Sequence, residues 1–353
     1  MFYKQAIYSF LSVVLGCIFL FITTVVVSDP YSLFHEKWFH KGEIYPNMRV
    51  QAYGLINSED FDGIIMGTSM LENTSAYETS KKLNGRFINL SVSGGSHFER
   101  FIILDYALKK KKLNRIIMSI DFKFETIGKA DDTFLPKLYT KDALKEKLKF
   151  YTYTDPLKCV FLQDCNFKKY DPNLPNAWKD KNFHKCRFGG YENWMKYKNK
   201  DHQIQDVIRI LKSEDFMANI DVNMGKKIID TEILPLFRNK QVQFDLIFPP
   251  YNILWWKKLE SRAKVFNIYE YLIQKIENYQ NVKAYWFYDE GIPSKIELYK
   301  DLTHYHYSIN SLQIDAIKNK TNIIDLKNYK QKFNDWRDKI NKFNIQPYID
   351  QIQ

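Results

Sequence analysis

Two short motifs, far apart in the chain, carry the residue types of a nucleophilic serine and its base. The Gly-Thr-Ser sequence at 67–69 follows an apolar run, and Asp301 stands three residues before His304. In that arrangement Ser69 would attack an acyl group, His304 would take and return the proton, and Asp301 would orient the imidazole. The pair of motifs therefore predicts acyl transfer or ester hydrolysis through a covalent acyl-enzyme.

Each motif also has a structural interpretation. Thr68 and Ser69 could simply cap the helix that follows them. His306 is a rival base, although it would need a different turn to reach Asp301. Leu71 occupies the last position of a Gly-x-Ser-x-Gly pattern, so the motif is not the nucleophile elbow of the α/β-hydrolases.

Further candidate site residues follow other predicted strands. The N–H groups of Gly94 and Ser69 are the expected oxyanion donors, because a glycine permits positive φ and close backbone approach. Asp121 follows the third strand, and Pro250 and Tyr251 belong to a Pro-Pro-Tyr sequence after the fourth. We expect these three residues to line the site. The alternatives are a helix cap for Asp121 and a rigid strand exit for the Pro-Pro-Tyr sequence.

The positions of these residues depend on a predicted α/β fold. Five apolar runs are predicted to be strands, and another is a candidate sixth: 62–66, 86–90, 115–120, 242–248 and 282–287, with 322–326 as the sixth. Helical patterns lie between them at 76–83, 99–111, 263–279 and 308–318. Most of the strand runs are continuously apolar rather than alternating, which is typical of parallel strands covered on both faces. We expect a three-layer sandwich around a mostly parallel five-stranded sheet in flavodoxin-like order.

The pattern along the chain also predicts its organisation. The expected parts are a transmembrane anchor at 6–28, a connector at 29–57, an α/β domain at 58–330 with an insertion at about 129–240, and a C-terminal helical tail at 331–353. The insertion is dense in turn residues and poor in strand patterns. An insertion over the carboxyl edge of a parallel sheet would lie where ligands bind in such folds, so it is a candidate lid.

The N-terminal segment predicts a membrane anchor. No charged residue occurs from Gln5 to Ser28. As a helix, residues 6–27 would extend roughly 33 Å at about 1.5 Å per residue, enough to cross a hydrocarbon core of about 30 Å. A cleaved signal peptide and a lipoprotein site at Cys17 are the alternatives. The length of the run and the lack of a small-x-small site favour a single uncleaved anchor.

The charge and motif content of the chain limit the classes of binding partner that we expect. The 353-residue chain has a net charge of +11, which suits contact with anionic lipid headgroups or acidic glycans. No helix-turn-helix, zinc or RNA-binding pattern occurs, so nucleic acid is not an expected partner.

The cysteines and the other ligand-type residues indicate no cofactor. Cys159, Cys165 and Cys186 would allow one disulfide in an oxidising compartment, and the sequence leaves its pairing open. Their spacing matches no zinc pattern. We expect neither a metal nor a cofactor.

Taken in order, the motifs resemble the SGNH (GDSL-like) hydrolase superfamily. The nucleophile block corresponds to 67–69, the glycine block to Gly94, and the last block to Asp301 and His304. The resemblance covers roughly Phe61 to Ile127 and Phe244 to Lys318. It implies the triad and the oxyanion donors named above.

One block departs from that pattern. Ordinary members carry Gly-x-Asn-Asp, whose asparagine donates to the oxyanion. This chain has Asp121 at the corresponding place, and a carboxylate cannot donate unless it is protonated. Similar departures occur in the membrane-anchored branch, which includes the teichoic acid D-alanine transfer protein and the alginate and peptidoglycan O-acetylation proteins.

The resemblance to that branch implies a function and a place in the cell. The expected protein is a membrane-anchored acyltransferase or esterase that acts on acyl esters, acetyl by preference, of a cell-surface polysaccharide. It would lie in the bacterial inner membrane with its globular domain outside the cytoplasm, beside a membrane-bound O-acyltransferase partner. The alternatives are a plain carbohydrate esterase and a non-catalytic glycan-binding or scaffold protein on a degenerate SGNH fold.

Overall fold

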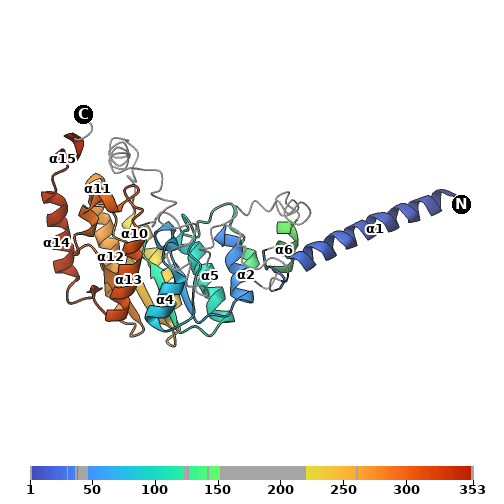
Figure 1. The fold of residues 1–353 in the computed structure, drawn as a ribbon, viewed down its shortest axis with the longest axis horizontal. Coiled ribbons are helices and arrows are strands. Elements are labelled where there is room, and N and C mark those ends of the chain that lie inside the picture. Colours follow the sequence, from blue (N-terminus) through green and yellow to red (C-terminus); the bar gives the residue numbers. More distant parts are fainter. Residues whose placement is uncertain are drawn as a thin grey trace. The chain divides into compact units, whose positions relative to one another are not determined.

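The fold is seen in a computed structural model of the chain (Figure 1). It describes residues 2–29, 31–35, 38, 47–122, 124, 127–140, 143–151, 220–259 and 261–350. Cys159, Cys165 and Cys186 lie outside the described residues, as does the disulfide expected among them. Most of the predicted insertion lies outside them too.

The described strands form one six-stranded sheet with the order β2-β1-β3-β4-β5-β6. The strands are β1 (Gly63–Met66), β2 (Phe87–Asn89), β3 (Arg115–Ser119), β4 (Gln243–Phe248), β5 (Val282–Trp286) and β6 (Ile323–Ile324). The first five pair in parallel, and β6 pairs antiparallel with β5. The predicted α/β class and mostly parallel sheet are confirmed.

The predicted number of five strands was wrong. The candidate sixth run supplies β6, whose register places Ile323 opposite Tyr285 and Ile324 opposite Ala284. A further backbone hydrogen bond, from Trp286 N to Asn322 O at 2.8 Å, extends this pairing. A strand of two residues is too short to show a hydrophobic period, so the sequence offers it only as a candidate and the pairing with β5 establishes it.

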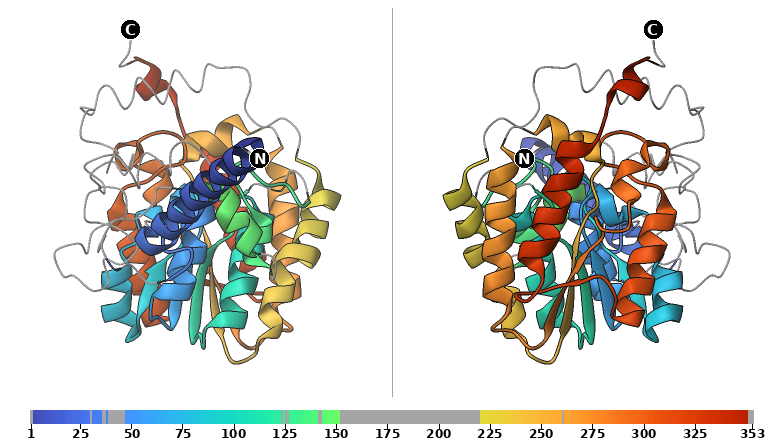
Figure 2. Two further views of the ribbon diagram at one scale, coloured as in Figure 1. Left: turned by 90° about the vertical axis from the view of Figure 1, so that its right-hand side faces the viewer. Right: turned by 90° about the vertical axis from the view of Figure 1, so that its left-hand side faces the viewer.

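Helices cover both sides of this sheet, with α4 and α13 on one side and α5, α10 and α12 on the other (Figure 2). Around the sheet the described helices are α3 (Ser69–Glu72), α4 (Ala76–Leu83), α5 (His97–Lys110), α10 (Val222–Ile228), α11 (Ile253–Lys258), α12 (Arg262–Ile276), α13 (Tyr307–Asn319), α14 (Tyr329–Lys342) and α15 (Gln346–Ile349). Single turns complete the connections: a π-helical turn η4 (Ile229–Ile233) and the 3₁₀ turns η5 (Leu234–Arg238), η6 (Ile292–Ser294) and η7 (Ile296–Leu298). The nearly uninterrupted burial of β1 and β4 follows from this double coverage.

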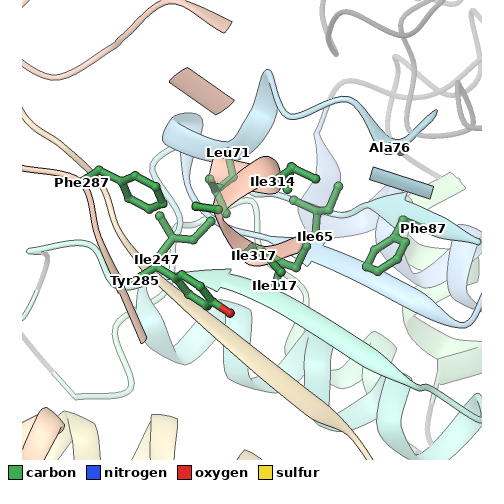
Figure 3. Close-up of a cluster of buried hydrophobic side chains, with 11 residues drawn as sticks. Ile65, Leu71, Ala76, Phe87, Ile117, Ile247, Tyr285, Phe287, Ile314 and Ile317 are labelled. Carbon is green, nitrogen blue, oxygen red and sulfur yellow. The ribbon is translucent and has the colours of Figure 1, made fainter. Parts of the chain in front are cut away.

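One apolar cluster holds the site-bearing segments on the sheet (Figure 3). Strand residues Ile65, Ile117 and Ile247 are fully buried within it. Leu71 joins them from α3, and Ile314 joins them from α13. Burial of an aliphatic side chain of this size contributes about 1.5–3 kcal/mol. The cluster therefore fixes the helix that begins at Ser69 and the helix that follows His304 on the same face of the sheet.

The chain divides into two compact units, Met1–Glu59 with Leu135–Lys169 and Asp60–Phe134 with Tyr170–Gln353. The sheet belongs to the second unit. The first contains α1 (Phe2–Ser28), α2 (Met48–Ser58), the 3₁₀ turn η1 (Pro136–Tyr139) and α6 (Ala143–Tyr151). Residues 135–151, predicted as part of the insertion, thus group with the N-terminal helix.

Helix α1 is long and apolar enough to cross a membrane over Tyr3–Ser28, a pattern that a secretory signal sequence shares. Its end is fixed by Asp29, whose carboxylate accepts hydrogen bonds from Leu33 N at 2.9 Å and Phe34 N at 2.8 Å. The Tyr151 hydroxyl donates to the same carboxylate at 2.6 Å. These bonds tie α6 to the end of α1 within the N-terminal unit.

Candidate active site

Ser69, His304 and Asp301 form a continuous hydrogen-bonded chain. Ser69 Oγ lies 2.7 Å from His304 Nε2, and His304 Nδ1 lies 2.7 Å from Asp301 Oδ2. Ser69 is the first residue of α3, two residues beyond the turn entry that follows β1 at Gly67, whereas the other two belong to the loop between η7 and α13. The structure therefore brings together residues separated by more than half the chain.

The loop that carries Asp301 and His304 is held by its own carboxylate. Asp301 Oδ1 accepts from the backbone N–H groups of Thr303 and His304, each at 2.8 Å, which leaves Oδ2 for the imidazole. Backbone bonds close the loop at its base, from Lys300 N to His304 O and from His306 N to Leu298 O. A three-residue spacing therefore suffices to place the carboxylate against Nδ1.

The surroundings of Asp301 favour its charged form. Burial by itself would raise the pKa of this carboxyl, but the hydrogen bonds from the His304 ring and from the backbone of His304 and Thr303 outweigh it. The pKa of Asp301 lies well below its ordinary value as a result. An ionised Asp301 accepts a hydrogen bond from Nδ1–H, which leaves Nε2 as the ring nitrogen that accepts from the Ser69 hydroxyl.

The turn at Ser69 is shaped by the residues before it. Gly67 N donates to Ser91 Oγ at 3.1 Å, and a Cβ at Gly67 would lie 2.8 Å from Leu71 Cβ and from Ser119 Oγ. Thr68 caps α3, because its hydroxyl oxygen accepts from Met70 N at 3.3 Å. Thr68 therefore caps α3, and the next residue, Ser69, lies at hydrogen-bond distance from His304.

A pocket of about 130 Å³ opens beside the triad. It is lined by Thr68, Ser69, Met70, Gly94, Asp121, Phe122, Tyr251, Thr303 and His304. Gly94 has a φ of 61°, a left-handed conformation that glycine adopts without strain. The two expected oxyanion donors, Ser69 and Gly94, thus border the same space as the triad.

Two sequence-predicted candidates lie outside this pocket. Pro250 is not among the lining residues, and its carbonyl accepts from the Tyr299 hydroxyl at 2.6 Å. His306, the rival base, caps α13, and its Nδ1 accepts from Ser308 N at 3.0 Å. The geometry therefore favours His304 over His306 as the base of the triad.

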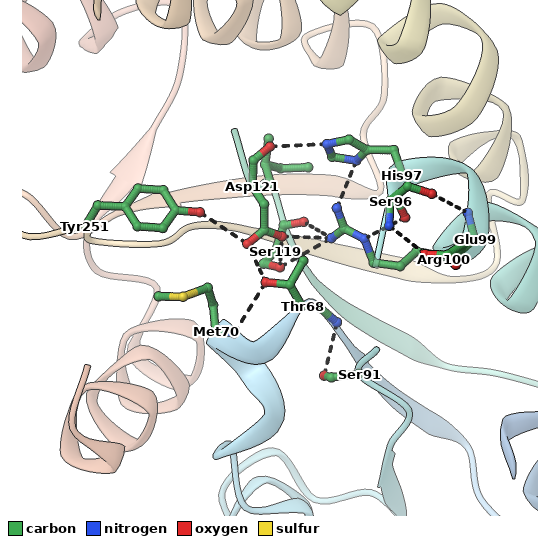
Figure 4. Close-up of polar contacts among 12 residues, drawn as sticks. Thr68, Met70, Ser91, Ser96, His97, Glu99, Arg100, Ser119, Asp121 and Tyr251 are labelled. Carbon is green, nitrogen blue, oxygen red and sulfur yellow. Dashed lines mark hydrogen bonds and ion pairs between the residues drawn. The ribbon is translucent and has the colours of Figure 1, made fainter. Parts of the chain in front are cut away.

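Asp121 lines the pocket as predicted, but within a buried polar network (Figure 4). Arg100 Nη1 lies 3.0 Å from Asp121 Oδ2, and both side chains are almost fully buried. Sequence reasoning missed Arg100. The sequence pattern that could have indicated it is the position of Arg100 on the same helix face as the buried Ile103 and Leu104. A charge on a buried face is very costly unless it is paired, so a buried partner could have been expected.

His97 completes the network. Burial, and secondarily the charge of Arg100, lower the pKa of His97 well below its ordinary value, so the ring is neutral. Its Nδ1 accepts from Arg100 Nη2 at 3.1 Å, and its Nε2–H donates to Asp121 O at 3.2 Å. Among the residues that the structure describes, no group of three or more metal-ligating side chains could hold an ion.

The chain matches no protein-family model and no curated protein. The site itself offers a serine hydroxyl, a base oriented by a carboxylate, and backbone amides beside a small pocket.

Proposed function

We propose that this chain is a serine acyltransferase or esterase of SGNH type. The observation that carries the proposal is the hydrogen-bonded series Asp301–His304–Ser69, with both side-chain links at 2.7 Å. Ser69 and His304 of this series line a pocket. The parallel sheet with helices on both faces suits the three-layer sandwich that the resemblance implies. Residues of this kind, in this order, perform acyl transfer in unrelated folds.

The proposed reaction has two half-steps. Ser69 Oγ attacks the ester carbonyl while its proton moves to His304 Nε2, and the N–H groups of Ser69 and Gly94 hold the oxyanion. Collapse breaks the ester bond, and the alcohol leaves with the proton from His304. An acceptor hydroxyl then attacks the acyl-Ser69 ester and gives its proton to His304 Nε2. The acyl group passes to the acceptor, and His304 returns the proton to Ser69 Oγ. The acceptor is a glycan in a transferase and water in an esterase.

The size of the pocket favours a short acyl group. At about 130 Å³ it is smaller than the 300–1,000 Å³ typical of sites for drug-sized ligands. Met70, Phe122 and Tyr251 supply apolar surface for a methyl-bearing group. We therefore propose an acetyl ester of a cell-surface polysaccharide, with the sugar outside the pocket.

The apolar helix α1 supports a proposal for where in the cell this protein lies. We propose that α1 anchors the chain in the bacterial inner membrane, with the α/β unit outside the cytoplasm and a membrane-bound O-acyltransferase as donor partner. The apolar length of α1 supports the anchor, and the resemblance of the motifs supports the partner. Protease protection in intact spheroplasts tests the topology. Cleavage of the α/β unit from outside is expected, and its protection would contradict the orientation.

The second candidate function is a non-catalytic glycan-binding protein on the same fold. It is favoured by Asp121, which sits where ordinary members carry an amide donor and accepts hydrogen bonds in this chain. A scaffold of this kind would bind a polysaccharide without forming an acyl-enzyme.

Covalent labelling by a serine-reactive fluorophosphonate separates the two functions. The full chain in detergent should be labelled at Ser69, and Ser69→Ala and His304→Ala should each abolish the label. His306→Ala is the matched control, because it removes a nearby imidazole that caps α13 outside the pocket. Labelling that persists in both site variants would contradict nucleophilic attack by Ser69 with His304 as the base. An unlabelled wild-type chain that still binds acetylated polysaccharide would favour the scaffold.

A further inference from the structure

The carboxylate of Asp121 is saturated with donors. Its two oxygens accept from Thr68 Oγ1 at 2.8 Å, Tyr251 OH at 3.2 Å, Arg100 Nη1 at 3.0 Å and Ser119 Oγ at 2.5 Å. Those partners come from four different segments of the fold (Figure 4). A carboxylate so occupied acts only as an acceptor.

Arg100 compensates the charge of this carboxylate. Its guanidinium, 1% exposed, also donates to Ser119 O at 2.7 Å and to the neutral ring of His97. A guanidinium stays protonated in proteins, so the buried pair carries no net charge toward the pocket. Asp121 can therefore line a site that must hold an oxyanion without imposing an uncompensated negative charge.

The contact that matters for the triad runs through Thr68. Its single hydroxyl proton is donated to Asp121 Oδ1, which turns the hydroxyl oxygen toward Met70 N. That geometry fixes the first turn of α3, and Ser69 is the next residue in the chain. Asp121 thus fixes Thr68 through this hydrogen bond, and Thr68 is bonded to Ser69 through the peptide link. The position of the Ser69 hydroxyl and N–H therefore depends on Asp121.

We infer that Asp121, held by Arg100, is a positioning residue that sets Ser69 through the Thr68 hydroxyl. The inference rests on the proposed function and deepens it. It reverses the role of the amide found at this block in ordinary family members: Asp121 receives hydrogen bonds and gives none to the substrate. Oxyanion stabilisation then falls to the backbone N–H groups of Ser69 and Gly94.

The test removes one hydroxyl. Thr68→Val keeps the shape of the side chain and loses the donor to Asp121, whereas Thr68→Ser keeps the donor. Thr79→Val is the matched control. Thr79 is also buried, and its hydroxyl donates to Ser75 O at 2.7 Å in α4, away from the pocket. Each full-length variant in detergent is labelled with a fluorophosphonate, and both the rate constant and the final stoichiometry are measured.

The two readouts separate positioning from folding. A partly unfolded variant lowers the stoichiometry, but a misplaced Ser69 lowers only the rate. We expect Thr68→Val to slow labelling about 10- to 100-fold at full stoichiometry. Thr68→Ser and Thr79→Val should both stay within about threefold of the wild type. A Thr68→Val rate equal to that of the wild type, or an equal slowing in Thr79→Val, overturns the inference.

A second measurement does not depend on catalysis. In a crystal structure of Thr68→Val, Ser69 Oγ should leave hydrogen-bond distance of His304 Nε2 or occupy more than one rotamer. If the wild-type chain is not labelled at all, the proposed function fails and this structure alone decides the positioning role. An unchanged Ser69 rotamer, 2.7 Å from His304 as in the wild type, contradicts it.

Discussion

Replacement of Asp301 by asparagine tests how the triad is oriented. Asp301 Oδ2 accepts from His304 Nδ1 at 2.7 Å, and Oδ1 accepts from the backbone of Thr303 and His304. An asparagine oxygen can keep the backbone bonds, so the loop should remain in place. Its amide nitrogen would then face Nδ1 and would stabilise the tautomer that accepts there. Nε2 would carry the proton and could no longer accept from Ser69.

The expected loss is large. In a Ser-His-Asp triad the same substitution lowers kcat by about 10⁴-fold through the wrong tautomer, which is about 5 kcal/mol of transition-state stabilisation. The pKa of Asp301 is held below its ordinary value, so the wild-type carboxylate stays ionised throughout the neutral range. The loss should therefore come from the substitution itself and not from protonation of Asp301 in the wild type.

The assay is the rate of p-nitrophenyl acetate hydrolysis together with the rate of fluorophosphonate labelling. Asp289→Asn is the control, because Asp289 pairs with Lys332 on the surface. Far-ultraviolet circular dichroism checks that both variants are folded. An Asp301→Asn variant that retains more than about a tenth of the wild-type rate would refute the orienting role of this carboxylate.

Three further outcomes follow from the packing. Burial raises the pKa of Asp245 to about 6, although the charge of Arg115 partly offsets this rise. Because the pKa of Asp245 is higher in the folded state than in the unfolded state, this group favours folding at low pH. That contribution to stability is lost as the pH rises through about 6. Urea unfolding should therefore show Asp245→Asn gaining about 2–3 kcal/mol relative to the wild type between pH 4 and pH 8, and a constant difference would contradict the shift. Arg100→Met should destabilise the fold by about 3–5 kcal/mol because it leaves the Asp121 carboxylate buried and unpaired, and a loss below 1 kcal/mol would show that water relieves the charge. Gly67→Ala forces a Cβ against Leu71 and Ser119; it should cost about 1–3 kcal/mol and slow fluorophosphonate labelling, whereas an unaffected rate would mean that the Ser69 turn tolerates the shift.

The site was partly predictable because it follows local rules. A Gly-Thr-Ser turn after an apolar run and an Asp-x-x-His sequence are short-range signals, and the carboxyl ends of parallel strands meet at one edge. The placement of Ser69 and His304 at hydrogen-bond distance agrees with that reasoning. Their catalytic roles stay predictions.

What the sequence could not give is long-range pairing. Arg100 lies in α5 and Asp121 follows β3, and nothing in either local pattern specifies that they form a buried ion pair. The two-residue strand β6 is likewise defined by its partner, β5, rather than by its own period. Pro250 was expected in the site from a Pro-Pro-Tyr sequence, but only the following residue, Tyr251, reaches the pocket.

The acyl-enzyme is the most direct measure of the central claim. The full chain is mixed with p-nitrophenyl acetate, quenched in acid within the first turnover, and digested for mass spectrometry. We predict a peptide containing Ser69 that is heavier by one acetyl group, absent in Ser69→Ala and strongly reduced in His304→Ala. An unmodified Ser69 during measurable wild-type turnover, or equal acetylation of Ser69 in His304→Ala, would contradict the triad.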